Sequence, residues 1–168
     1  MKTLIVIDMQ NDFIDGSLGT KEAQAIVPNV KKKIEEYDAR EDAIVFTRDT
    51  HFENYLETSE GKNLPVKHCI MDTHGWQIAD GLEVPYARYL NKPTFGWLGW
   101  KSLDFDDEIE IVGLCTDICV VSNALILKAM FPEIKITVDA SCCAGVTPET
   151  HKAALQTMKM CQINVIGE

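Results

Sequence analysis

The sequence has few basic residues and no long apolar segment. Lysine and arginine together number 16, against 26 aspartates and glutamates, which gives a formal net charge of -10. A surface with this excess of negative charge repels phosphate backbones and anionic lipid headgroups. No apolar run approaches the roughly 20 residues that cross a bilayer. We therefore expect neither nucleic acid nor a membrane among the partners of this chain.

A secretion signal and a cysteine framework are also missing. The apolar stretch at the start of the chain is interrupted by Asp8, too early for the apolar core of a signal peptide. The six cysteines include no Cys-x-x-Cys pair, and in a chain of this length we expect free thiols rather than disulfides. These absences favour a cytoplasmic protein.

Short apolar runs alternate regularly with helical patterns along the chain. A length of 168 residues fits one domain, residues 1–168. The apolar runs predict strands at 4–7, 43–47, 86–91, 108–113, 134–138 and 163–166, and the periodic segments predict helices at 25–38, 117–130 and 148–160. This order predicts a three-layer α/β/α fold around a mostly parallel, doubly wound sheet of about six strands.

Reactive side chains follow four of these strands. Asp8 ends the first strand, and Lys92 follows the third. Asp49 and His51 follow the second strand, and Cys119 follows the fourth. Because ligands bind outside the carboxyl ends of parallel strands, we expect these side chains to share one site.

Cys119 lies in the first turn of a predicted helix, after an apolar strand and a tight turn. The positive end of a helix dipole stabilises a thiolate, the nucleophilic form of cysteine. Asp8 beside it would take the thiol proton and return it to a leaving amine, although a carboxylate here would also cap the following turn. Lys92 would stabilise both negative charges, or would be an ordinary solvated lysine.

Two histidines and an aspartate form a candidate metal site. Asp49 and His51 lie two residues apart in an extended segment, so their side chains point to the same side. His68 follows within an irregular segment, 50–85. A segment of this length in a compact domain usually has a function. This set suits a divalent metal ion with open positions; ordinary hydrogen-bonded histidines are the alternative.

Residues 95–100 read Phe-Gly-Trp-Leu-Gly-Trp and are rich in aromatic rings. Such a segment, with Phe13 opposite, suits a flat apolar pocket for a planar ring. Ordinary packing in the core explains the same residues equally well.

Taken together, these segments resemble the isochorismatase-like cysteine hydrolases, and within them the nicotinamidases. The matching segments, in the order of the family, are residues 4–13, 47–51, 65–69, 92–95, 113–120 and 139–145. They span nearly the whole chain. Asp-Met-Gln-Asn-Asp-Phe at 8–13 and Thr-Asp-Ile-Cys-Val at 116–120 are specific in combination, and each alone is moderately so.

The resemblance implies a catalytic triad of Asp8, Lys92 and Cys119. In this family the triad hydrolyses nicotinamide to nicotinate and ammonia through a cysteine thioester, a step of NAD salvage. The resemblance also implies a cis peptide between Leu114 and Cys115, with the N–H groups of Cys115 and Cys119 forming the oxyanion hole.

One divalent metal ion is implied as well, zinc in the first place, with iron or manganese as alternatives. The resemblance assigns it to Asp49, His51 and His68. Some members of the family supply a fourth ligand from the loop between the two histidines. Glu60 is the best-placed candidate here, and Glu57 is the second.

The chain departs from the family pattern at the substrate ring. Many nicotinamidases carry a large aromatic residue about three positions before the second metal histidine, where this chain has Leu64 and Pro65. Phe13, Phe95 and Trp97 are therefore the candidates for contact with the substrate.

The leading interpretation is thus a metal-dependent nicotinamidase with a small-molecule amide as its substrate. A hydrolase of carbamoyl or ureido amides, from the same superfamily, is the second interpretation. A thiol redox protein that uses Cys115 and Cys119 is the third. Because members of the family are often dimers or larger, we also expect a homo-oligomer.

Overall fold

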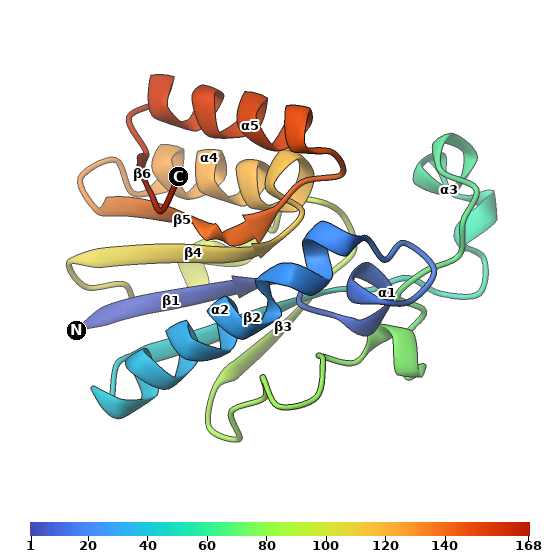
Figure 1. The fold of residues 1–168 in the computed structure, drawn as a ribbon, viewed down its shortest axis with the longest axis horizontal. Coiled ribbons are helices and arrows are strands. Elements are labelled where there is room, and N and C mark those ends of the chain that lie inside the picture. The colour runs from blue at the N-terminus through green and yellow to red at the C-terminus, as the bar shows by residue number, and fades with distance from the viewer.

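Six parallel strands form the centre of the molecule (Figure 1). The computed structural model describes all residues, 1–168. The strands are β1 (Lys2–Ile7), β2 (Ala43–Asp49), β3 (Arg88–Lys92), β4 (Glu108–Leu114), β5 (Lys135–Ala144) and β6 (Asn164–Ile166). Their order in the sheet is β3-β2-β1-β4-β5-β6, so the predicted doubly wound α/β fold is confirmed. The order reverses between β1 and β4, and ligands bind at such a switch point.

Three long helices make the outer layers. Figure 1 shows α2 (Lys21–Ala39) on one side of the sheet, with α4 (Val121–Met130) and α5 (Pro148–Met160) together on the other. The shorter elements are α1 (Asn11–Ile14), η1 (Tyr55–Glu57), α3 (Ser59–Asn63), η2 (His74–Trp76), η3 (Gly99–Ser102) and the π-helical turn η4 (Thr116–Val120). None of the helices has the length and apolar character needed to cross a membrane.

Successive residues of β1 pack into the two opposite cores. Leu4 and Val6 belong to the apolar cluster beneath α2, whereas Ile5 and Ile7 belong to the cluster beneath α4 and α5. Successive side chains of a strand point to opposite faces. A strand that is buried on both faces is therefore apolar without interruption, which is why this strand is visible in the sequence.

Two elements next to the candidate site differ from the sequence prediction. The strand predicted to end at 138 continues to Ala144, after a register shift against β4 between Ile111 and Gly113. The helix predicted to begin at 117 becomes a regular α-helix only at Val121, because a π-helical turn precedes it. Turns of this kind are frequent at functional sites.

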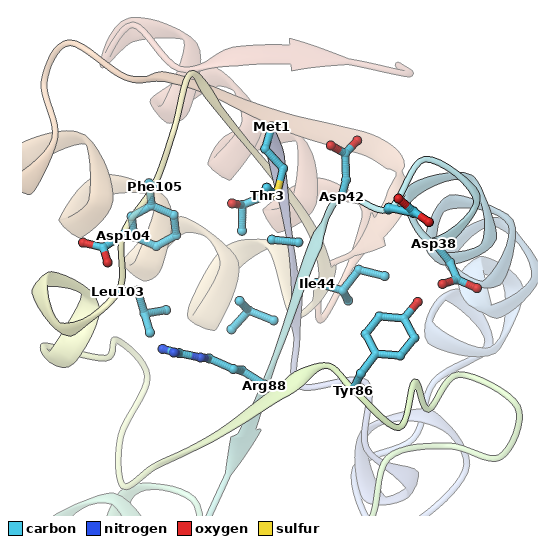
Figure 2. Close-up of a pocket in the computed structure, with 13 residues that line it drawn as sticks. Met1, Thr3, Asp38, Asp42, Ile44, Tyr86, Arg88, Leu103, Asp104 and Phe105 are labelled. Atoms are coloured by element: carbon cyan, nitrogen blue, oxygen red, sulfur yellow. The ribbon is translucent and has the colours of Figure 1, made fainter.

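A groove of about 720 Å³ opens at the amino-terminal ends of the strands (Figure 2). Thr3, Ala43 and Arg88, from the starts of β1, β2 and β3, line it. Asp42, also in its lining, accepts hydrogen bonds from the Lys2 N–H at 3.0 Å and from Arg40 Nε at 2.9 Å. The predicted catalytic side chains lie at the carboxyl ends of the strands instead, so the candidate site is on the opposite side of the sheet from this groove.

Candidate active site

Asp8, Lys92 and Cys119 meet at the carboxyl ends of β1, β3 and β4. Lys92 Nζ lies 2.7 Å from Asp8 Oδ2 and donates a hydrogen bond to Cys119 Sγ at 3.4 Å. Asp8 and Lys92 are fully buried, and Cys119 is 5% exposed. The structure thus brings together the three residues that were predicted to catalyse.

Further hydrogen bonds hold the carboxylate and the ammonium in place. Thr47 Oγ1 donates to Asp8 Oδ1 at 2.6 Å. Lys92 Nζ donates to the Thr94 carbonyl at 3.1 Å, one residue beyond Pro93. Asp8 itself has φ 48°, a left-handed conformation that aspartate tolerates better than most residues.

Burial controls the protonation of these three groups. It raises the pKa of the Cys119 thiol well above the usual range, and the charge of Asp8 adds to this rise while Lys92 opposes it. Burial also raises the pKa of Asp8, against the lowering effect of Lys92. Burial alone would lower the pKa of Lys92, but the charges of Asp8, Cys119 and Asp49 raise it. Cys119 therefore rests as a thiol beside a charged ammonium, and Asp8 is the base within reach.

This result changes one expectation from the sequence. The helix dipole was expected to favour the thiolate of Cys119, but burial of the sulfur raises the pKa of this thiol and so favours the protonated form. The nucleophile is consequently formed only when a base removes the proton.

The turn before the nucleophile has the predicted backbone. The Leu114–Cys115 peptide bond is cis. Gly113 has φ 120°, and a Cβ at this position would lie 2.1 Å from the Ile7 carbonyl oxygen, so the close approach of β4 to β1 requires glycine. The Cys115 carbonyl then accepts hydrogen bonds from the N–H groups of Ile118 and Val120, at 3.1 and 3.0 Å.

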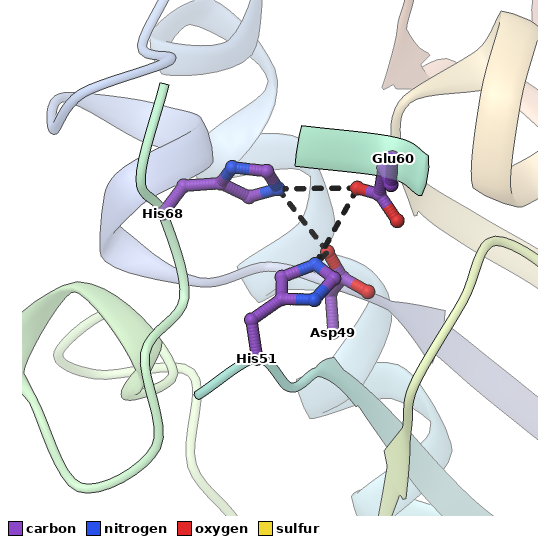
Figure 3. Close-up of side chains that lie close together, drawn as sticks. All are labelled: Asp49, His51, Glu60 and His68. Atoms are coloured by element: carbon purple, nitrogen blue, oxygen red, sulfur yellow. Dashed lines mark hydrogen bonds and ion pairs between the residues drawn. The ribbon is translucent and has the colours of Figure 1, made fainter. Parts of the chain in front are cut away.

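Asp49, His51, Glu60 and His68 form a cluster in which the ligand atoms lie within 4.8 Å of one another (Figure 3). His51 Nε2 is 2.8 Å from Asp49 Oδ2 and 3.4 Å from Glu60 Oε1. His68 Nε2 is 3.4 Å from Asp49 Oδ2 and 3.7 Å from Glu60 Oε1. Of the two glutamates considered for the fourth position, Glu60 joins the cluster and Glu57 does not.

Backbone pairing brings the two histidines together although they are distant in the sequence. His51 forms an isolated parallel bridge with Ile70. The His51 N–H donates to the Cys69 carbonyl at 2.9 Å, and the Met71 N–H donates to the His51 carbonyl at 2.9 Å. His68 therefore lies directly beside the end of β2.

Glu60 reaches the cluster from the first turn of α3. The Thr58 side chain caps this helix by accepting a hydrogen bond from the Gly61 N–H at 3.0 Å. A Cβ at Gly61 would lie 2.0 Å from the Tyr55 carbonyl oxygen. Only glycine allows α3 to pack this closely on η1, so Gly61 fixes the position of its neighbour Glu60.

The chemistry of the cluster fits a divalent cation. His68 Nδ1 lies 2.8 Å from the Val66 carbonyl, which places the ring proton on Nδ1 and leaves Nε2 free as a ligand. Asp49 Oδ1 is buried and accepts no hydrogen bond. Burial alone would lower the pKa of His51, but its bonds to Asp49 and Glu60 raise it to about 9. The two carboxylates thus favour positive charge between them.

One residue of the triad and three of the cluster line the same cavity, of about 230 Å³. Cys119 lines this cavity together with Asp49, Glu60 and His68. The rest of the lining is largely apolar and includes Phe13, Leu18, Leu64, Phe95, Ile118 and Val146. A small, mainly apolar molecule would therefore contact the thiol and the cluster at once.

Of the three aromatic residues predicted to bind substrate, two line the cavity and one does not. Phe13 and Phe95 line the cavity, and the Phe13 ring centroid lies 5.5 Å from that of His68. Trp97 is not in the lining. It packs edge-on against the buried Trp100, with ring centroids 4.9 Å apart, so this prediction is not supported by the cavity.

Comparison with known proteins identifies the family of the chain. The Isochorismatase domain family matches residues 2–167. The chain belongs to the isochorismatase family. It is 25% identical to the nicotinamidase/pyrazinamidase of Mycobacterium tuberculosis, over 99% of this chain and 98% of that protein. It is also 25% identical to the nicotinamidase of Saccharomyces cerevisiae, over the full length of both.

A solved structure gives the same result for the fold. The pyrazinamidase of Pyrococcus horikoshii in complex with zinc superimposes with a TM-score of 0.81, at 26% identity, over 99% of both chains. The predicted resemblance to the isochorismatase-like hydrolases, and to the nicotinamidases among them, is confirmed.

Sequence reasoning missed the residues that support the site of this isochorismatase family member. Gln10 is fully buried, donates from Nε2 to the Asp49 carbonyl at 2.9 Å and accepts from the Asp49 N–H at 2.7 Å. Asp12 Oδ2 accepts from the Cys69 N–H at 2.8 Å and so holds the residue next to His68. The sequence feature that pointed to Gln10 and Asp12 was the group of polar residues directly after a buried strand.

Proposed function

We propose that this protein is a metal-dependent nicotinamidase, which hydrolyses nicotinamide to nicotinate and ammonia through a thioester on Cys119. The proposal rests on one observation: Cys119 of the buried triad and three of the four residues of the candidate metal cluster, Asp49, Glu60 and His68, line the same cavity of about 230 Å³. Nicotinamide carries an amide for the thiol and a ring nitrogen for the cluster. Its apolar ring suits the walls between them.

The relatives support the reaction class. Because the two relatives described above are nicotinamidases that match nearly the whole chain, the expectation of an enzyme that hydrolyses a non-peptide C–N amide bond is confirmed. The metal dependence and the thioester are the parts that belong to the proposal.

In the first half of the reaction, Asp8 takes the proton of the Cys119 thiol. The sulfur forms a bond to the amide carbon, and the carbonyl oxygen becomes negatively charged. When this oxyanion collapses, the C–N bond breaks and Asp8 returns the proton to the leaving nitrogen, which departs as ammonia. Lys92 remains protonated and stabilises the charge on Asp8 and on the sulfur in turn.

In the second half, water replaces ammonia in the cavity. Asp8 takes a proton from this water, and the resulting hydroxide attacks the thioester carbon. The C–S bond breaks, the proton on Asp8 returns to the Cys119 sulfur, and the product acid loses its remaining proton to solvent and leaves as nicotinate. In both halves we assign the oxyanion to the backbone N–H groups of Cys115 and Cys119, which belong to the turn at the start of η4.

The residues Asp49, His51, Glu60 and His68 would hold the metal ion. When bound, a divalent ion supplies a Lewis acid for the ring nitrogen of the substrate. Lys92 Nζ lies 3.6 Å from Asp49 Oδ1, so the cluster also contributes negative charge that keeps this lysine protonated.

The test is ammonia release from nicotinamide by zinc-reconstituted protein. We expect Cys119→Ala to reduce the rate of ammonia release by a factor of about 10⁴ or more, and chelation of the metal to abolish release. Cys161→Ala, at an exposed cysteine, is the matched control and should remain active. Added hydroxylamine should divert the thioester to nicotinohydroxamate. If protein with bound zinc releases ammonia only from ureido or carbamoyl compounds, the pyridine substrate is wrong and the alternative amide hydrolase is right.

A further inference from the structure

Asn123 is a fully buried polar residue in the apolar helix α4, one turn after Cys119. Its Nδ2 donates to the carbonyl of Phe95 at 3.0 Å and to that of Cys119 at 2.8 Å. Its Oδ1 accepts from the Trp97 N–H at 2.8 Å and from Trp100 Nε1 at 3.1 Å. An asparagine amide has two donors and two acceptor positions, so every one of them is used.

Two of these bonds clamp a tight turn of the backbone onto α4. Asn123 holds the carbonyl of Phe95 and the N–H of Trp97, on either side of Gly96. A Cβ at Gly96 would lie 2.4 Å from Cδ1 of Ile126 in the same helix. The backbone at 95–97 therefore lies directly on α4, and the amide of Asn123 fixes its path.

The clamped turn carries two parts of the active site. The Phe95 side chain lines the cavity together with Cys119. The carbonyl of the preceding residue, Thr94, accepts the hydrogen bond from Lys92 Nζ. Because the same amide also binds the carbonyl of Cys119, one side chain sets the spacing between a wall of the cavity and the nucleophile.

We propose that Asn123 is a positioning residue that holds Phe95 at a fixed distance from Cys119 and so limits the size of the ring that reaches the thiol. The identity of that ring, a pyridine carboxamide, rests on the proposed function. A polar residue is expensive at this buried helical position unless all its hydrogen bonds are made. The four bonds offset that cost, and three of them act on residues at or beside the cavity.

The first measurement needs no turnover. Cys119 is alkylated in separate experiments with iodoacetamide, which is small, and with N-phenylmaleimide, which is bulky, and the modified peptide is quantified by mass spectrometry. The sulfur displaces iodide from the first reagent; it adds to the alkene of the second, whose other carbon takes a proton. Both reactions consume thiolate, so the ratio of the two rates cancels the thiolate fraction and reports access to the sulfur.

We expect Asn123→Ala and Asn123→Ser to reduce this preference for the small reagent by about five- to tenfold, the range for the loss of one or two hydrogen bonds. A serine hydroxyl in a helix bonds the carbonyl four residues earlier. Asn123→Ser therefore retains the bond to Cys119 and loses the clamp. Leu127→Ala, at a fully buried position one turn further along α4, is the control for lost stability and should keep the wild-type ratio.

The second measurement uses nicotinamide. Both Asn123 variants should raise KM by about five- to tenfold, whereas Leu127→Ala should leave KM unchanged below its Tm. The inference is overturned if the Asn123 variants keep the wild-type ratio and KM, or if Leu127→Ala changes both equally, because Asn123 would then only stabilise the fold. If wild-type protein fails to hydrolyse nicotinamide, the proposed function falls while the alkylation ratio still decides the role of Asn123.

Discussion

Cys115 and Cys119 are four residues apart, yet only Cys119 contacts the ammonium of Lys92. Burial raises the pKa of Cys115 to about 12, and the charge of Asp117 contributes to the rise. A thiol with this pKa has almost no thiolate at neutral pH and is a poor redox group. The role assigned to Cys115 uses its backbone N–H alone.

The substitution Cys115→Ser should therefore leave most of the activity. A serine keeps the backbone donor, so the loss in kcat should stay well below the roughly 10²–10³-fold that removal of an oxyanion donor causes. Ammonia release from nicotinamide measures it, with Cys119→Ala alongside. A loss as complete as that of Cys119→Ala would instead show that the side chain of Cys115 takes part in the reaction.

The residues proposed to catalyse were predictable one by one, but the residues that hold them were not. Asp8, Lys92 and Cys119 follow strand ends and lie in motifs of the family. Gln10 and Asn123 act through hydrogen bonds to backbone groups that the fold brings close. Such partners are set by tertiary structure, and a single buried amide in a sequence does not reveal them.

Some secondary-structure elements were also predictable from the sequence, whereas others were not. β1 was predicted because a strand buried on both faces is a continuous apolar run, and β4 because apolar residues dominate it although Glu108 and Glu110 interrupt them. The continuation of β5 to Ala144 was missed because its polar residues interrupt that pattern. Asp139 Oδ1 accepts from the Ser141 N–H and hydroxyl, at 3.0 and 2.6 Å, which satisfies these groups within the irregular part of the strand.

The helix α3 was missed as well, although it decides between Glu57 and Glu60. It has five residues, too few for a periodic pattern. We expect Gly61→Ala to displace α3 from η1, because the added Cβ meets the Tyr55 carbonyl. Zinc affinity should fall by about 10–100-fold, as for other changes that disturb the support of a metal ligand.

Competition with a chromophoric chelator measures this affinity. Glu57→Ala is the matched control on the same segment, because Glu57 lies outside the cluster, and it should bind zinc like wild type. Equal affinity of Gly61→Ala and wild type would show that α3 does not determine the position of a ligand.

At the scale of the whole molecule, the sheet order creates the site. Neighbouring strands in the sheet are distant in the sequence, and the order β3-β2-β1-β4 places Lys92, Asp49, Asp8 and the turn before Cys119 side by side. Alternating strands and helices predicted a parallel sheet, but apolar patterns do not contain the order of its strands. The expected homo-oligomer stays a prediction.

A second charged network joins α2 to the sheet away from the site. Lys33 Nζ lies 2.7 Å from Glu110 Oε1 and 2.9 Å from Asp139 Oδ2. Burial alone would raise the pKa of Asp139, but hydrogen bonds from Ser141 and Lys33 lower it. Burial alone would lower the pKa of Lys33, but its bonds to Glu110 and Asp139 raise it.

The signs of these shifts define a pH window. The contribution of Asp139 to stability is present above its unfolded pKa, near 3.8, and is lost as the pH falls through the lower folded value. The contribution of Lys33 is present below 10.5 and is lost as the pH rises through the higher folded value. Both contributions are therefore complete near neutral pH.

We expect Lys33→Met to lower Tm by about 5 °C at pH 7, because it leaves two carboxylates close together without a cation. The difference from wild type should begin to shrink only as the pH falls below about 3.8, because the contribution of Asp139 is lost through its lower folded pKa. Thermal unfolding at pH 3, 5 and 7 measures the trend. Lys32→Met, on the exposed face of α2, is the control, and a difference that is constant with pH would contradict the argument.

Metal binding should stabilise the whole fold, because its ligands come from β2, α3 and the 50–70 loop, which approach one another only in the folded chain. At zinc concentrations about 100 times Kd, binding adds about 2.7 kcal/mol to the free energy of unfolding. For a chain of this size that corresponds to a rise in Tm of roughly 5–10 °C. Thermal unfolding with zinc and with a chelator measures it.

The variant Glu60→Gln separates the cluster from other zinc ligands. It removes one ligand charge, so the zinc-dependent rise in Tm should become small. In the chelated protein at neutral pH, Glu60→Gln should be slightly less stable than wild type, because Glu60 is one of the two carboxylates whose bonds raise the pKa of His51 to about 9. An equal rise with zinc in both proteins would mean that the ion binds elsewhere, for example at the exposed Cys161, and Cys161→Ala would then abolish the rise.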